Sequence, residues 1–153
     1  MGRFRLEYEN SMKKSSLIII SLLIVAAIGL FFLQGEKQNN NTGLWKDATY
    51  TENTTLGTGA NTLIVTVEAN DKSVDFTIKT DKTVVGDALK EHNLIDGEEG
   101  PYGLYVKVVN GIEADYDKDE SYWAFNKDGE SMQTGVDQSE FKNGEHYELV
   151  YTK

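Results

Sequence analysis

One short acidic run holds the residues best suited to bind a cation. Aspartates occupy every second position and a glutamate ends the run: Asp115, Asp117, Asp119 and Glu120. Carboxylates spaced in this way open the calcium loop of an EF-hand, where hard oxygen ligands surround one ion. The rest of that loop is absent, because its sixth position is Glu120 instead of glycine and its twelfth is Asn126 instead of glutamate. The run therefore predicts either an irregular Ca²⁺ site or a solvated acidic loop.

A second group of candidate residues is aromatic. The segment SYWAFNKDGE places Tyr122, Trp123 and Phe125 within four positions, just before a turn-like Asn-Lys-Asp-Gly. Successive side chains of a strand point to opposite faces, so Tyr122 is expected on one face and the other two on the opposite face. In a two-layer domain only one of these faces can pack under a helix. A ligand-binding role is expected for whichever set points away from the helix.

The sequence offers little for catalysis. It has no cysteine, and its two histidines, His92 and His146, stand at the ends of expected elements. It also lacks a glycine-rich phosphate loop, a G-x-S-x-G elbow and an H-E-x-x-H motif. We therefore expect no enzyme activity. The formal net charge of −10 disfavours nucleic acid as a partner, because phosphates would be repelled.

An uncharged apolar run, LIIISLLIVAAIGLFFL, covers residues 17–33 and follows Lys13 and Lys14. Its length is at the short end of what spans a bilayer core of about 30 Å. Positive charge before the run places residues 1–16 in the cytoplasm and the rest of the chain outside. The alternative is a cleaved signal peptide starting at Met12. Because the run is longer than a usual signal core and no small-x-small site follows it, we favour a membrane anchor.

The compartment follows from this choice. We expect a single-pass protein of the cell membrane with an extracellular C-terminal domain, or a secreted protein if the segment is cleaved. Residues 34–60 are rich in Asn, Thr and Gly and have few apolar residues, so they are expected to form a flexible linker. Trp45 within it is expected to be incidental.

Residues 61–153 have the pattern of one small domain. Two alternating runs over 62–81 predict an antiparallel hairpin, and residues 83–93 have helical spacing. IDGEEGPYG, at 95–103, is expected to be a loop, and Asn110-Gly111 is a strong hairpin signal. Further antiparallel strands are predicted at residues 104–109, 121–125, 130–136 and 146–152. One helix on a mostly antiparallel sheet is an α+β domain, and the β-grasp is its simplest architecture.

The C-terminal pattern resembles a known family. Tyr122-Trp123, Gly135-Val136 and Gly144-Glu145 carry the resemblance, which extends over residues 62–153. It resembles the C-terminal β-domain of transcobalamin and intrinsic factor, and the bacterial domains of unknown function related to it. The resemblance implies a β-grasp-like fold that covers one face of cobalamin, while a helical-barrel domain holds the other face.

By the same resemblance, Tyr122, Trp123 and Phe125 are the expected ligand contacts. No helical-barrel domain is expected in this chain, so the affinity for such a ligand should be weak unless a partner completes the site.

The function predicted from the sequence is that of a membrane-tethered extracellular binding module. Its ligand would be a soluble small molecule, with cobalamin as the candidate, and it could also present a surface to a transporter or another cell-surface protein. The alternative is a structural or adhesive cell-surface domain, stabilised by Ca²⁺, with no small-molecule ligand.

Overall fold

The computed structural model describes residues 42–153, whose strands form two β-sheets. The predicted anchor at 17–33, the segment 1–16 and the first part of the expected linker lie outside the described residues. Within residues 42–153, no helix is long and apolar enough to cross a membrane.

The larger sheet has six strands in the order β1-β3-β2-β9-β7-β8. Their bounds are β1 Thr54–Gly57, β2 Asn61–Ala69, β3 Lys72–Thr80, β7 Tyr122–Lys127, β8 Glu130–Ser131 and β9 His146–Thr152. The predicted hairpin of β2 and β3 is confirmed, with Val65 opposite Phe76. The sheet is nevertheless mixed, since β1 runs parallel to β3 and β9 runs parallel to β2. The other pairings are antiparallel, as expected, and the parallel placement of β1 and β9 is what the sequence did not predict.

The parallel pairing of β2 with β9 follows from their apolar patterns. Val65 lies opposite Tyr147 and Val67 opposite Leu149, and all four are buried. Any one-residue slip would turn one strand's apolar side chains to solvent, so burial specifies this register. The last strand of the chain therefore lies in the centre of the sheet, next to the first long strand.

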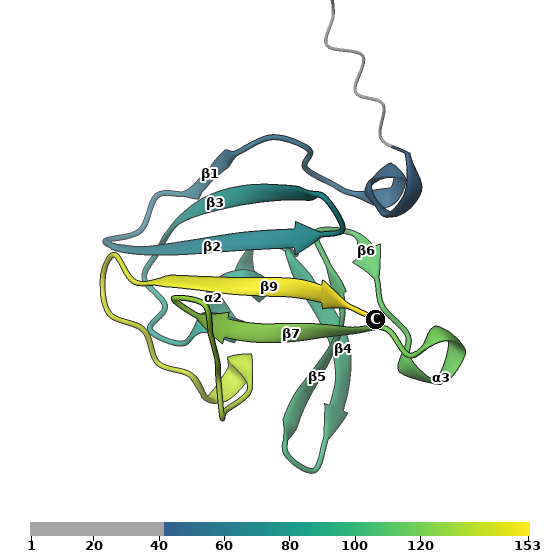
Figure 1. Ribbon diagram of the computed structural model, residues 1–153. Coiled ribbons are helices and arrows are strands. Elements are labelled where there is room, and N and C mark those ends of the chain that lie inside the picture. The colour runs from purple at the N-terminus through teal and green to yellow at the C-terminus, as the bar shows by residue number, and fades with distance from the viewer. Residues whose placement is uncertain (1–41) are drawn as a thin grey trace, which may run out of the picture. The chain divides into compact units, whose positions relative to one another are not determined.

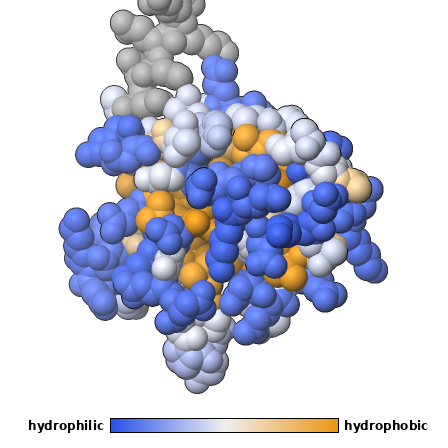
Figure 2. All heavy atoms as spheres, turned by 180° about the vertical axis from the view of Figure 1, so that it is seen from behind, coloured by the Kyte–Doolittle hydropathy of each residue, from blue (hydrophilic) through white to orange (hydrophobic). Residues whose placement is uncertain are grey.

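A second layer covers one face of this sheet. It contains the helix α2, Val85–Glu91, and a three-stranded sheet made of β4 Ile95–Gly100, β5 Gly103–Val109 and β6 Ile112–Glu113. Figure 1 shows α2, β4 and β5 behind the six-stranded sheet, and none of the described elements lies in front of β3, β2 and β9. The reverse side of the molecule is mostly hydrophilic, with apolar atoms visible only in small patches (Figure 2). The α+β class is thus confirmed, and α2 lies within the predicted helical segment.

The strand β4 was expected to be a loop. It pairs with β5 through a bulge between Asp96 and Gly97, and it is the edge of its sheet. Most of its side chains are at least partly exposed, so the sequence shows no apolar alternation. Apart from the buried Ile95 and side-chain ion pairs such as that of Glu98 with Lys107, this strand is held by backbone pairing, which explains why side-chain patterning missed it.

The segment 42–60 was expected to belong to a flexible linker, and the structure contradicts this. A 3-10 helix, η1 (Gly43–Asp47), inserts Trp45 into the core, where its side chain is 4% exposed. The indole Nε1 donates a hydrogen bond of 2.9 Å to the carbonyl of Ala69, and the Lys72 ammonium lies 4.8 Å above the ring. The globular domain therefore includes residue 42 onward.

Asn110 holds the middle of this segment against the second sheet. Its side chain is fully buried and exchanges two hydrogen bonds with the backbone of Tyr50, at 2.9 and 2.8 Å. Its carbonyl also accepts from the backbone N–H of Thr49 at 2.8 Å. The side-chain amide of Asn110 thus gives the Tyr50 backbone the two hydrogen bonds that a neighbouring strand would otherwise supply. Asn110 also belongs to the expected Asn110-Gly111 turn.

Replacing Trp45 with alanine tests whether this segment belongs to the folded unit. We expect Trp45→Ala to lower the free energy of unfolding by about 3 kcal/mol, because it leaves a cavity and removes a buried hydrogen bond. Thermal unfolding of the full chain in mild detergent would measure it. Tyr102→Ala is the control, since Tyr102 is 89% exposed and should change stability little. Equal stability of the two variants would show that Trp45 is not docked.

Candidate functional site

One face of the six-stranded sheet, here named the open face, is not covered by any element of residues 42–153. It carries the polar side chains that alternate with the buried ones, and a groove of about 670 Å³ crosses it. The residues lining this open-face groove come from β1, β2, β3 and β9 and the residue before β1: Asn53, Thr54, Thr55, Ile64, Thr66, Asp75, Thr77 and His146. Side chains far apart in the sequence therefore converge at the centre of the sheet.

A chain of hydrogen bonds crosses the groove from β3 to β9. The hydroxyl of Thr66 donates to Asp75 Oδ1 at 2.7 Å and lies 2.8 Å from His146 Nε2. Asn53 brackets Asp75, because its Oδ1 accepts from the Asp75 backbone N–H at 2.9 Å and its Nδ2 donates to Asp75 Oδ2 at 3.3 Å. A hydroxyl has one proton, and here an ionised carboxylate accepts it. His146 Nε2 must therefore be the donor to Thr66.

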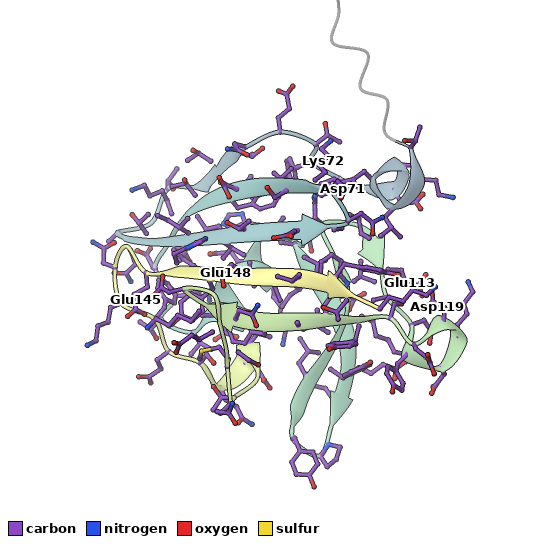
Figure 3. The ribbon with its side chains drawn as sticks, viewed as in Figure 1. Asp71, Lys72, Glu113, Asp119, Glu145 and Glu148 are labelled. Carbon is purple, nitrogen blue, oxygen red and sulfur yellow. The ribbon has the colours of Figure 1, made fainter. Side chains whose placement is uncertain are left out.

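The other ring nitrogen of His146 faces a second carboxylate. His146 Nδ1 lies 3.6 Å from Glu148 Oε1, two residues further along the same strand. Both carboxylate oxygens of Glu148 lie 3.1 Å from the backbone N–H of Gly129, in the turn between β7 and β8. Figure 3 shows Glu148 on β9, on the side turned to the viewer. Sequence reasoning named His146 but missed Thr66, Asp75 and Glu148, because their alignment depends on which strands are neighbours.

The start of β9, and with it the position of His146, is held by Glu145. Its carboxylate accepts from Lys127 Nζ at 2.9 Å, from the Lys142 backbone N–H at 3.0 Å and from the buried Tyr147 hydroxyl at 3.0 Å. The hydrogen bond from Lys127, followed by the one from Lys142, lowers the pKa of Glu145 from 4.5 to about 2. Burial and then the bond to Glu145 raise the pKa of Tyr147.

An exposed pair of tyrosines lies at the other end of the open face. Tyr122 on β7 is 39% exposed and Tyr116 is 55% exposed, and their ring centroids are 6.5 Å apart. Between this pair and Glu148, the open face carries the adjacent small apolar side chains of Ala124 and Val150. The open face is therefore aromatic and apolar at one end and hydrogen-bonding at the other.

The three aromatic residues expected to contact a ligand are divided between two faces. Tyr122 is on the open face, as the alternation predicts. Trp123 is 7% exposed and lies edge-on to Tyr151 in the core, with ring centroids 5.5 Å apart. Phe125 is partly buried and stacks on Tyr147. Only Tyr122 of the three is placed where a ligand could reach it without opening the core, and its role in binding stays a prediction.

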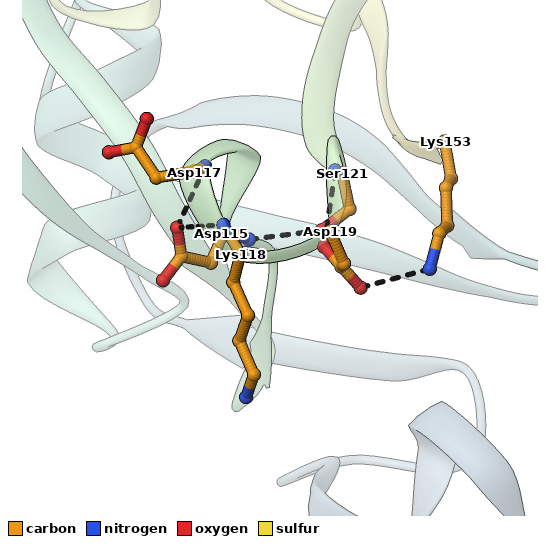
Figure 4. Close-up of polar contacts among 6 residues, drawn as sticks. All are labelled: Asp115, Asp117, Lys118, Asp119, Ser121 and Lys153. Atoms are coloured by element: carbon orange, nitrogen blue, oxygen red, sulfur yellow. Dashed lines mark hydrogen bonds and ion pairs between the residues drawn. The ribbon is translucent and has the colours of Figure 1, made fainter.

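The acidic run forms a short helix, α3 (Tyr116–Asp119), instead of an open loop. Asp115 is the N-cap, and its side chain accepts from the backbone N–H groups of Asp117 and Lys118 (Figure 4). Such a cap satisfies backbone donors that have no partner inside the helix. Glu120 ends the helix in a left-handed conformation with φ of 62°.

The carboxylate of Asp119, the third acidic residue of the run, has other partners. It accepts from the hydroxyl and backbone N–H of Ser121 and pairs with Lys153 Nζ at 3.2 Å (Figure 4). The hydrogen bond from Ser121, and then the one from Lys153, lower the pKa of Asp119. The four acidic side chains of the predicted Ca²⁺ site are thus not brought together. Across residues 42–153, no group of three or more His, Asp or Glu side chains is arranged to hold a metal ion.

Comparison with known proteins supports a shared fold. Residues 81–153 match the model of a family described as Domain of unknown function (DUF4430). The chain is similar to the crystal structure of a "putative metal binding protein" from Ruminococcus gnavus ATCC 29149. The two are 34% identical over 61% of this chain and 97% of that protein, with a TM-score of 0.58. A search of curated protein sequences found no match.

The chain is also similar to haptocorrin, whose structure was solved in complex with Cbi. Here the identity is 22%, the TM-score is 0.50, and the similarity covers 61% of this chain. The chain spans 25% of haptocorrin's length. At this identity the likeness concerns the fold alone. The expected resemblance to a transcobalamin-type β-domain is supported to that extent.

The contacts of Glu145 predict a pH-dependent stability. A depressed carboxyl pKa contributes stability above the unfolded value near 4.5 and loses it as the pH falls toward 2. We expect Glu145→Gln to lower the free energy of unfolding by about 1–2 kcal/mol at pH 7, less than the full shift would imply because the side chain is partly exposed.

The difference between Glu145→Gln and the parent chain should shrink between pH 4.5 and pH 2 in thermal unfolding. Glu130→Gln on the exposed strand β8 is the control and should follow the parent curve at every pH. A difference for Glu145→Gln that does not change with pH would contradict the assignment.

Proposed function

We propose that this chain, which belongs to one family with the R. gnavus protein, is a binding module that holds a soluble ligand on the open face of its six-stranded sheet. The observation that carries the proposal is the composition of this face. It joins an exposed tyrosine pair to a hydrogen-bonding groove of about 670 Å³. Ligand sites commonly combine an aromatic or apolar surface with a few polar groups that orient the ligand.

The hydrogen bonds among Asp75, Thr66 and His146 support a binding role over a catalytic one. Thr66 is the one hydroxyl close to a histidine in the groove, at 2.8 Å from His146 Nε2. Its proton is directed to Asp75, so His146 donates to this oxygen instead of accepting from it. A general base would need the opposite arrangement. We propose that the module performs no chemistry on its ligand.

A corrinoid is the ligand that we propose to test first. Cobalamin has a flat macrocycle with amide side chains, and the open face offers tyrosine rings beside amide, hydroxyl and carboxylate groups. The similarity to haptocorrin, solved with Cbi, supports this choice at the level of fold. We also propose that the domain is a variant of the β-grasp, with its first hairpin, its helix and its central last strand in the same order.

The open face can cover only one side of such a ligand. Affinity should be weak unless a partner covers the other side. We propose a transporter or another cell-surface protein for that role. We further propose that residues 17–33 tether the domain to the cell membrane, with the globular part outside.

Binding of cobalamin to the full chain in mild detergent tests the ligand proposal. Equilibrium dialysis, read by the absorbance of the corrinoid, should show saturable binding. We expect Tyr122→Ser to weaken it about tenfold, because loss of one stacking ring removes about 1–1.5 kcal/mol of contact free energy. Tyr102→Ser removes a more exposed ring from the β4–β5 turn and should leave binding unchanged.

Two outcomes would overturn this proposal in different ways. No binding up to millimolar cobalamin would exclude the corrinoid and favour the structural or adhesive alternative. Binding that Tyr102→Ser weakens as much as Tyr122→Ser would place the ligand away from the open face.

Localisation can be tested on intact cells that express the full chain. A lysine-reactive reagent that does not cross membranes should label the globular domain, and the labelled chain should fractionate with membranes. Chain recovered in the medium would indicate a cleaved signal peptide instead. Unlabelled chain inside the cells would contradict the proposed orientation.

A further inference from the structure

His146 and Glu148 place two electron-rich groups opposite each other on the open face. They stand at positions i and i+2 of β9, so both side chains point to the same face of the sheet. Their facing atoms, His146 Nδ1 and Glu148 Oε1, are 3.6 Å apart. An N–H···O hydrogen bond is usually about 2.7–3.2 Å long, so this separation is too long for one.

The hydrogen bonds in the groove determine which ring nitrogen of His146 carries the proton of the neutral imidazole. Asp75 takes the hydroxyl proton of Thr66, and Nε2 therefore carries the ring proton that is donated to Thr66. In a neutral imidazole the second nitrogen is then a lone pair. That lone pair faces the Glu148 carboxylate at 3.6 Å, so a cation shared by the two groups, either a proton or a metal ion, would make the contact favourable.

Glu148 is well placed to share such a cation. Its side chain is only 15% exposed, and Oε1 faces His146 Nδ1 at 3.6 Å. The Gly129 N–H contacts both of its oxygens at 3.1 Å, which fixes the orientation of the carboxylate. The Gly129 donor thus orients the carboxylate without bringing a positive charge to it.

We propose that His146 Nδ1 and Glu148 bind a divalent transition-metal ion, with Zn²⁺ as the probe. Bonds of about 2.0–2.2 Å around a tetrahedral ion place two of its ligands about 3.4 Å apart, close to the distance observed here. Imidazole nitrogen favours Zn²⁺, Cu²⁺ or Ni²⁺ over Ca²⁺, which prefers oxygen ligands alone. The site needs no organic ligand, although His146 also lines the open-face groove.

The groove supplies the outer support that metal-binding histidines usually have. Such a histidine donates its second N–H to a carboxylate, a carbonyl or water, which sets the tautomer and the ring orientation. Here His146 Nε2–H donates to Thr66, and Thr66 passes the bond to Asp75. Thr66 is a positioning residue. Because two protein side chains hold the ion, water must complete its coordination, and affinity should be modest.

Nuclear magnetic resonance of the full chain with ¹⁵N-labelled histidine provides a direct test. The chain has two histidines, and His92 serves as an internal reference, since it lies on the end of α2 away from the open face. Titration with Zn²⁺ at pH 7.5 should shift the Nδ1 resonance of His146 while its Nε2 keeps its proton. The His92 resonances should not move, and Ca²⁺ should have no effect.

Three variants separate this site from a surface histidine that binds zinc by itself. Glu148→Gln should weaken Zn²⁺ binding at least tenfold, and Thr66→Val should weaken it about tenfold through the lost support of the ring. Glu113→Gln is the matched control, because this exposed carboxylate lies on β6 of the other sheet.

If a variant is poorly folded, the Zn²⁺ titration of the native chain still tests the proposal. The proposal is overturned if 1 mM Zn²⁺ leaves His146 unshifted, or if zinc binds at Nε2. It is also overturned if well-folded Glu148→Gln binds zinc as tightly as the parent. Loss of cobalamin binding would leave the zinc result intact, so the two proposals can fail separately.

Discussion

The parallel pairing of β2 with β9 is the constraint on which the rest of the structure depends. Leucine, valine and tyrosine side chains of the two strands align on one face, and their burial specifies the register. With that face turned to the core, the opposite face must carry the polar residues of both strands. The groove, its hydrogen-bonded chain and the His146–Glu148 pair are therefore consequences of how the core closes. A change in this register would dismantle the core and the groove together.

The remaining elements cover the buried face or hold the sheet in place. The helix α2 and the second sheet pack behind the six strands, and η1 inserts Trp45 beside the β2–β3 turn. Asn110 and Glu145 each join distant backbone segments by several hydrogen bonds from one side chain. These contacts leave the open face uncovered, because each lies in the core, behind the sheet or at its rim. The domain thus combines a closed core with one large accessible surface.

Many local features were predicted correctly from the alternation of apolar and polar residues and from the turn-forming residues. The hairpin of β2 and β3, the turn at Asn110-Gly111 and the separation of Tyr122 from Trp123 were all readable, since each depends on a few adjacent residues. Strand β4 could not be predicted from the sequence, because an edge strand can form through backbone pairing without an alternating apolar pattern. The acidic run was misleading for a related reason. Its spacing suggested an ion site, but local donors and Lys153 occupy the carboxylates of Asp115 and Asp119.

By itself, the sequence determined the α+β class, most strand positions and the face on which Tyr122 lies, because the period of a strand is a local property. Only the tertiary structure decided that Trp45 belongs to the core and that Thr66, Asp75, His146 and Glu148 meet. Thr66 and His146 are 80 residues apart in the sequence, yet their side chains are 2.8 Å apart in space. That contact exists because burial of apolar side chains selects which strands become neighbours, and this selection is a property of the whole core.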